Sequence, residues 1–272
     1  MSWSQVCCQY DGTFAGFLTC VYECYVHKEE PCEFRTTGDI CCSLYPLRSI
    51  VTDQSHAKRV YRSLAVQMNR ECQETVSRCF LTCLPEREVW MWRFIRMGYQ
   101  RGPVLLRDLA DPTVNTVLKA VRSLGSEAHL FTGFVRFSEL DGVLVSEIEP
   151  KNRVLPLLRP HFCGRYPQER FVIYDRTHKQ ALFHQPGRWA ILEVDEFSPG
   201  APDAEELRLR RLWRSFYHTI SIEGRYNPKC RQTNMPKRYW GTMTEFQEDP
   251  PAPSPRRDAL AQPGGPPSTS RE

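Results

Sequence analysis

The densest group of residues that could do chemistry lies in segment 225–240, RYNPKCRQTNMPKRYW, which holds five cations and no acid. Lys and Arg neutralise backbone phosphates, and aromatic rings stack on unpaired bases for about 1–3 kcal/mol each. The segment therefore predicts a nucleic-acid contact made by Arg225, Asn227, Lys237, Arg238, Tyr239 and Trp240. The same pattern also fits an arm that its aromatic residues, including Tyr226, pin to the core while the cations stay in solvent.

A second set of reactive side chains is expected where a long helix meets a sheet. A histidine near carboxylates can transfer protons, and the set predicted for this is His129, Glu127 and His161, with Glu149 beside them. Arg136 and Arg165 are expected to line a pocket at the same place and to bind nucleic acid. No H-x-x-x-H spacing supports a metal site, and a histidine at a helix end is often only structural.

The chain has twelve cysteines, which could mark a metal site or a disulfide framework. There is no C-x-x-C pair, and the closest patterns are Cys20 with Cys24 and Cys79 with Cys83, each one helical turn apart. Zinc and iron–sulfur sites use tighter, matched knuckles. With no secretory signal and no long apolar run, we expect a cytoplasmic protein with free, mostly buried thiols. No metal or other cofactor is predicted.

The elements that must position these residues fall into two halves. Helical periodicity is seen in 14–25, 56–68, 71–82, 86–98 and 112–124, after a short strand at 5–10. The cysteine-rich stretch 28–54 is expected to be an irregular loop. Alternating residues then predict five strands with tight connections, at 134–137, 143–149, 171–175, 180–184 and 189–194, with a short helix after the second.

The predicted fold is α+β, with a helical N-terminal half packed on a five-stranded antiparallel sheet, followed by a helix at 204–219 and the basic arm. Residues 1–246 are expected to form a single domain. Residues 247–272 are rich in Pro, Gly and Ser and should be a disordered tail. The net charge of +4 is too small to identify a nucleic-acid partner by itself.

Several motifs in fixed order resemble a bacterial domain family of unknown function that is linked to DNA repair and DNA metabolism. The resemblance covers residues 6–245, and its motifs include Tyr10-Asp11-Gly12-Thr13-Phe14, Glu127-Ala128-His129, Leu155-Pro156-Leu157-Leu158, Ile173-Tyr174-Asp175 and Met235-Pro236-Lys237-Arg238-Tyr239-Trp240. Members of that family are typically encoded beside a radical-SAM protein, and some are fused to a uracil-DNA-glycosylase-like domain. The resemblance implies DNA and a radical-SAM protein as partners.

Three functions are compatible with these observations. The first is a DNA-repair or DNA-metabolism accessory protein that binds nucleic acid and works with a radical-SAM partner. The second is an enzyme that acts on a modified base or nucleoside through the histidine–carboxylate set, so whether the protein is an enzyme stays open. The third is a protein-interaction module that makes no DNA contact.

Overall fold

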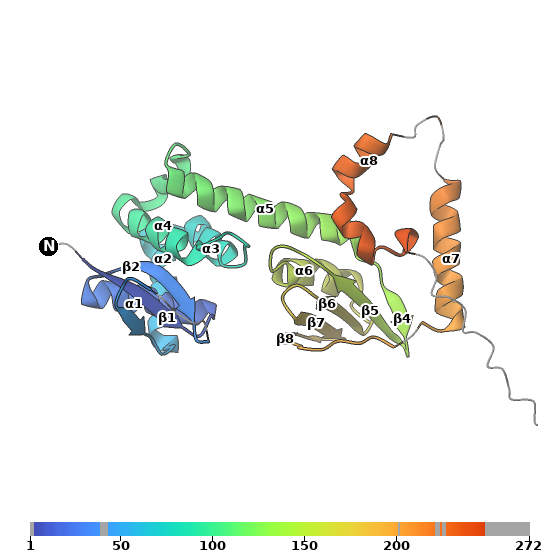
Figure 1. The fold of residues 1–272 in the computed structure, drawn as a ribbon, viewed down its shortest axis with the longest axis horizontal. Coiled ribbons are helices and arrows are strands. Elements are labelled where there is room, and N and C mark those ends of the chain that lie inside the picture. The colour runs from blue at the N-terminus through green and yellow to red at the C-terminus, as the bar shows by residue number, and fades with distance from the viewer. Residues whose placement is uncertain (1–2, 39–42, 201, 221–223, 225–226, 248–272) are drawn as a thin grey trace, which may run out of the picture.

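The computed structural model describes residues 3–38, 43–200, 202–220, 224 and 227–247. The predicted tail therefore lies outside the described residues except for Gln247, as do Arg225 and Tyr226 of the basic segment. The described chain forms two lobes that are joined by the long helix α5 (Pro112–Phe134) (Figure 1). No helix within the described ranges is both long and apolar enough to cross a membrane.

The N-terminal lobe holds a small parallel sheet that the sequence predicted only in part. The chain runs through β1 (Ser4–Tyr10), α1 (Phe14–His27), β2 (Glu29–Thr36) and β3 (Leu47–Ser49), and the strand order is β2-β1-β3. Both outer strands fall in the stretch expected to be a loop. In EEPCEFRT the alternation of apolar and polar residues is limited to 32–35, and LRS is too short to show one, so the extended form of both strands depends on pairing with β1.

Four helical segments follow this sheet in the chain and lead to the second lobe. They are α2 (Gln54–Gln67), α3 (Arg70–Cys79), α4 (Arg87–Arg101) and the 3-10 helix η1 (Gly102–Arg107). Helix α4 contributes to the core of this lobe, because Trp92, Phe94 and Ile95 are completely buried.

The C-terminal lobe contains the predicted five-stranded sheet, in the order β4-β5-β6-β7-β8. Its elements are β4 (Ser138–Leu140), β5 (Val143–Ile148), α6 (Leu155–Arg165), β6 (Phe171–Asp175), β7 (Gln180–Gln185) and β8 (Arg188–Glu193). The antiparallel prediction is wrong for one pair, since β5 and β6 are parallel. Helix α6 lies between these two strands in sequence and returns the chain to the end where β5 began, which allows parallel pairing. The sheet is therefore mixed.

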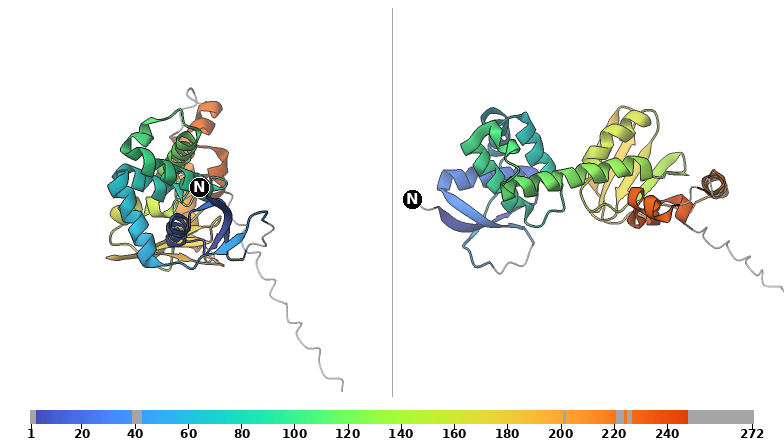
Figure 2. Two further views of the ribbon diagram at one scale, coloured as in Figure 1. Left: turned by 90° about the vertical axis from the view of Figure 1, so that its left-hand side faces the viewer. Right: turned by 90° about the horizontal axis from the view of Figure 1, so that it is seen from above.

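The C-terminal segment follows the sheet as α7 (Ala204–Thr219), α8 (Pro228–Asn234), η3 (Lys237–Thr242) and η4 (Thr244–Phe246). Figure 2 shows this segment beside the C-terminal end of α5, remote from the first lobe. Hence η3, η4 and α7 lie close to the connection between α5 and β4 (Figure 2). Several of the candidate site residues lie near this connection.

Residues 1–246, expected as one domain, contain two separate buried cores. The first includes Val114 and Val117 from the beginning of α5, and the second includes Leu124 and Phe131 from its later turns. One helix therefore contributes to both cores (Figure 2).

Candidate nucleic-acid interface

Glu127 is a buried clamp rather than a free acid or base. Its side chain is 3% exposed, and its two oxygens accept hydrogen bonds from Lys151 N at 3.0 Å, Asn152 N at 2.8 Å and Asn152 Nδ2 at 2.6 Å. Arg238 completes the cluster through an ion pair of 3.1 Å. Because these donors occupy both carboxylate oxygens, the role of Glu127 is to join α5, the loop after β5 and the C-terminal arm.

The proposed proton-transfer set is not brought together. His129 and His161 are both exposed, and within the described chain neither imidazole is hydrogen-bonded or ion-paired to Glu127. The ring of His161 lies edge-on to Phe162, with ring centroids 4.9 Å apart. Glu149 instead forms an exposed ion pair with Arg176 at 2.9 Å. The geometry gives acid–base catalysis by this set no support.

Arg136 is also held inside the protein. Its Nη2 and Nε donate to the two oxygens of Glu245 at 2.8 and 3.2 Å, and its Nη1 donates to Gly133 O at 2.8 Å. Glu245 is 1% exposed and accepts a further hydrogen bond from Trp213 Nε1 at 3.2 Å. A bidentate charged pair of this kind is strong and specific in geometry. It fastens η4 and α7 to the end of α5.

The aromatic residues of the arm pin it to the second core. Tyr239 is 2% exposed, and its ring centroid lies 5.0 Å from that of Phe131 and 5.2 Å from that of Phe134. Burial is the main cause that raises the pKa of Tyr239. Trp240 stacks on Phe246 at 4.4 Å and donates to Met235 O at 3.1 Å. Residues 235–246 thus adopt the pinned arrangement, and Tyr239 is not accessible to a base.

Other members of the basic segment remain at the surface. Asn227 caps α8 by accepting a hydrogen bond from Cys230 N at 3.0 Å. Lys237 is exposed, with its Nζ 5.9 Å from the centre of the Trp240 ring. Lys229 is exposed as well. The cations that could reach a phosphate are therefore fewer than the sequence suggested.

A groove of about 640 Å³ lies beside these clamps, between the end of α5, β4, α6 and α7. We call it the α6–α7 groove, and its lining includes Arg136, Phe137, Phe162, Arg165, Tyr166, Leu209 and Trp213. Arg165 is exposed, and its guanidinium carbon lies 5.7 Å from the centre of the Tyr166 ring. The groove thus brings together two of the predicted binding residues, Arg136 and Arg165.

Three residues of the groove were missed as site residues from sequence. Trp213 is 39% exposed on one wall, Tyr166 is half-buried near Arg165, and Arg210 pairs with Glu206 at 2.8 Å. The sequence offered a signal only for Tyr166, which directly follows the predicted binding residue Arg165. Trp213 and Arg210 carried no signal, because the sequence of α7 is that of an ordinary basic helix. The aromatic side chains that can meet a ligand are therefore on α6 and α7, not on the arm.

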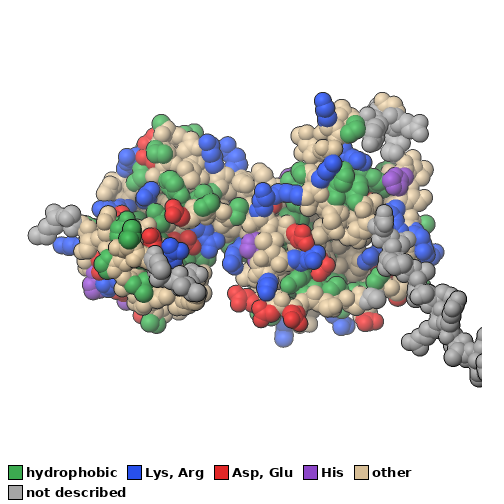
Figure 3. All heavy atoms as spheres, viewed as in Figure 1, with side chains coloured by type: hydrophobic (Ala, Val, Ile, Leu, Met, Phe, Trp, Pro, Cys, Tyr) green, Lys and Arg blue, Asp and Glu red, His purple; other side chains and the backbone are tan. Residues whose placement is uncertain are grey.

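Charge is spread over the surface rather than concentrated in one stripe. Figure 3 shows Lys and Arg side chains on both lobes of this face, with Asp and Glu side chains among them. The groove itself is also lined by Glu139 and Glu206, of which Glu206 is neutralised by Arg210. Arg165 is thus the arginine of the groove lining that forms no ion pair with a carboxylate among the described residues.

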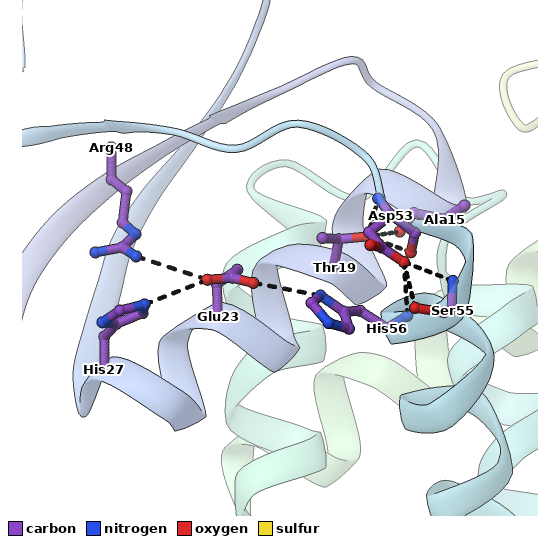
Figure 4. Close-up of polar contacts among 8 residues, drawn as sticks. All are labelled: Ala15, Thr19, Glu23, His27, Arg48, Asp53, Ser55 and His56. Atoms are coloured by element: carbon purple, nitrogen blue, oxygen red, sulfur yellow. Dashed lines mark hydrogen bonds and ion pairs between the residues drawn. The ribbon is translucent and has the colours of Figure 1, made fainter.

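A second polar cluster lies in the N-terminal lobe, away from the groove (Figure 4). The carboxylate of Glu23 on α1 faces His27 at 3.4 Å, His56 of α2 at 3.4 Å and Arg48 of β3 at 3.7 Å. The His56 ring also stacks on Tyr22 at 3.9 Å. Since His56 of α2 and Arg48 of β3 both reach Glu23 of α1, the cluster holds α2 and β3 against α1, while His27 pairs with Glu23 within α1.

Three buried thiols meet between β1 and α1. Cys8 Sγ lies 3.7 Å from Cys24 Sγ, and hydrogen bonding from Cys20 and Cys24 lowers the pKa of Cys8 while it raises the pKa of both donors. Among the described cysteines, Cys8, Cys20, Cys24, Cys72 and Cys79 are buried thiols that form no disulfide. No group of three or more His, Cys, Asp or Glu is arranged to hold a metal ion in the described part of the chain.

Comparison with known proteins places the groove inside a family match. Residues 85–245 match DUF4130, a domain of unknown function, and this range contains α4, α5, the mixed sheet and the arm. No curated protein matches the chain. The small parallel sheet of the first lobe precedes the matched range. Because the match covers more than half of the sequence, the chain belongs to the DUF4130 family, a family of unknown function.

Proposed function

We propose that the protein is a nucleic-acid-binding accessory protein of DNA repair or DNA metabolism that holds an unpaired strand in the α6–α7 groove. The observation that carries this proposal is the presence of Arg165, Tyr166 and the partly exposed Trp213 around one groove of about 640 Å³. Aromatic surfaces with a nearby cation are the usual means of binding single strands without reading their sequence.

The electrostatic part of the proposal rests on few residues. Arg136 and Arg238 are neutralised by Glu245 and Glu127, so they contribute little to the attraction of phosphate. Arg165 and Lys237 are exposed, and no carboxylate is paired with either in the described chain. We therefore expect weak binding that is strongly reduced by salt.

A salt titration of binding tests the proposal. Fluorescence anisotropy of a labelled single-stranded oligonucleotide should show a log–log salt slope that falls by about 0.7 in Arg165→Gln, because one phosphate contact is lost. Trp213→Leu should weaken binding at least fivefold, since a stacked base contributes about 1–3 kcal/mol. Arg70→Gln is the matched control, because Arg70 is an exposed arginine of α3 in the other lobe. Equal slopes in the two arginine variants would refute the role of the groove.

One observation favours a second function, a protein-interaction surface. Helix α7 exposes Leu209, Leu212 and Phe216 at the spacing of one helical face. A protein partner, such as the radical-SAM protein that the family resemblance implies, could cover this face. Co-purification of the two proteins with and without added DNA separates this function from the first. Complex formation that requires DNA would favour the nucleic-acid role.

A further inference from the structure

A second, smaller hollow lies against the α6–α7 groove. We call it the β5 pocket. It measures about 270 Å³, and its lining includes Leu140, Val145, Ser146, Glu147, Arg176 and Thr244. Arg136, Arg210 and Thr244 line both the pocket and the groove, so these residues form the wall between them. A molecule in the groove is therefore within reach of the pocket.

Ser146 is a residue of the pocket lining whose buried hydroxyl lacks a hydrogen-bond partner in the described structure. Its side chain lies on β5 and is 3% exposed. A buried hydroxyl without a partner costs about 1–3 kcal/mol. A ligand that hydrogen-bonds to Ser146 removes this cost, which gives the pocket a specific preference for polar edges.

The charges around the pocket argue against a phosphate ligand. Its three arginines, Arg136, Arg176 and Arg210, are each paired with a carboxylate, and Glu147 adds a further negative charge. The local balance is three positive charges against four negative ones, from Glu245, Glu149, Glu206 and Glu147. An anion would gain little there, so the ligand should be neutral.

The side chains favour a flat neutral ring. Leu140, Val145 and Pro199 offer apolar surface, while Ser146 and Glu147 offer hydrogen-bonding groups. A nucleobase has apolar faces and an edge that both donates and accepts hydrogen bonds, and enzymes hold extruded bases between apolar walls and edge-reading groups. At about 270 Å³ the pocket is slightly smaller than the roughly 300–1,000 Å³ of ordinary ligand sites. This size suits one base and excludes a longer segment.

We propose that the β5 pocket receives a single unpaired base of the strand held in the α6–α7 groove. This inference rests on the proposed nucleic-acid binding and adds where one base goes. The strand lies in the groove, the base passes beside Arg210 and Thr244, and its polar edge meets Ser146. Withdrawal of a base from a stack costs a few kcal/mol and least where the base is already unpaired, so single-stranded or mismatched sites should be preferred.

Gly241 allows the pocket to be filled without disturbing the fold. It lines the pocket, and a Cβ added to it would meet no atom within 4 Å. Gly241→Leu therefore adds a side chain at the pocket lining without a clash at its Cβ, and we expect it to narrow the hollow. Gly164→Leu is the matched control, because a Cβ on Gly164 also meets nothing within 4 Å and Gly164 does not line the pocket. Ser146→Ala removes only the unpartnered hydroxyl.

The experiment uses the full chain and a single-stranded oligonucleotide with one 2-aminopurine, whose emission is quenched when it stacks on another ring. None of the described residues that line the pocket is aromatic, whereas the groove carries Trp213 and Tyr166. We expect emission to rise on binding in the natural protein and in Gly164→Leu, and not in Gly241→Leu. Ser146→Ala should keep the rise and lose about fivefold in affinity, the value of one hydrogen bond.

The outcomes separate this inference from the proposed function. An equal rise of emission in Gly241→Leu and the natural protein would overturn the pocket assignment while strand binding stands. Absence of any anisotropy change with the oligonucleotide would overturn the proposed function and the inference with it. Free 2-aminopurine riboside is the second probe, and if it binds as tightly as the oligonucleotide, the pocket serves a free nucleoside and the strand-linked proposal is overturned.

Discussion

Glu127→Gln should destabilise the second lobe far more than its small chemical change suggests. The carboxylate accepts three hydrogen bonds from Lys151 and Asn152 and pairs with Arg238, while it is 3% exposed. An amide nitrogen in place of one oxygen turns a donor toward other donors. Loss of one partner of a buried ion pair typically costs about 3–5 kcal/mol.

The structure lowers that figure because one partner can be rehydrated. The Arg238 side chain is 39% exposed, so water can solvate its guanidinium once Glu127 is neutral. We therefore expect a loss of about 3 kcal/mol in the free energy of unfolding. For a chain of this size that corresponds to a fall in Tm of about 6–12 °C, at 2–4 °C per kcal/mol.

Urea unfolding followed by circular dichroism, with thermal melts in parallel, measures this loss. Glu149→Gln is the matched control, since it removes the same charge from an ion pair in which Glu149 and Arg176 are 51% and 53% exposed. Exposed pairs contribute about 0–1 kcal/mol. If both variants lose the same stability, Glu127 is not the clamp described above. Arg238→Met should fall between them, because it leaves the hydrogen bonds from Asn152 intact.

Two further perturbations follow from the first lobe. Gly16→Ala should destabilise it by about 1–3 kcal/mol, as overpacked sites do, because the new Cβ would lie 2.2 Å from Asp11 Oδ1; a thermal melt unchanged within error would contradict this. High pH should also weaken the fold, because burial raises the pKa of Cys72 to about 11 and that of Cys79 to about 12, from the usual 9.0. A raised pKa contributes stability below pH 9 that is lost as the pH rises through 11 and 12, at up to about 1.4 kcal/mol per pH unit for each group. Urea midpoints between pH 8 and pH 11 measure this loss, and Cys79→Ala should flatten it.

The sequence predicted those elements whose spacing of apolar residues is visible within the element itself. The apolar residues of α4 and the stripe of α5 recur at helical spacing, so both helices could be predicted without knowledge of their partners. Strand β2 was missed, because its sequence alternates only over 32–35, after two glutamates and a proline, and its extended form depends on pairing with β1. The direction of β6 depends on the path of α6 across the sheet, which periodicity does not reveal.

The sequence could predict several residues of the candidate site, but not which of them are paired and which are accessible. The structure pairs Arg238 with Glu127, whereas the sequence predicted Glu127 and Arg136 where the long helix meets the sheet and Arg238 in the separate segment 225–240. The sequence could not show that each charge is satisfied by a carboxylate or guanidinium brought from more than one hundred positions away, as Arg136 is by Glu245. Arg165 and Trp213 are the groove residues that remain accessible. Arg165 was among the predicted binding residues, whereas the local sequence of Trp213 indicates no site.

The two cores have a consequence for how the molecule responds to a ligand. The side chain of Asn152 donates to Glu127 in the second lobe and accepts a hydrogen bond at 2.9 Å from Cys83 N in the loop that follows α3. Together with the shared helix α5 and the hydrogen bond from Arg153 N to Leu81 O at 2.9 Å, this amide couples the unfolding of the lobes. A ligand that binds only the native second lobe stabilises it by mass action, and part of that stabilisation should reach the first lobe through Asn152. The number of unfolding transitions then reports whether the two lobes are thermodynamically coupled. One transition is expected when they are coupled and two when they are not.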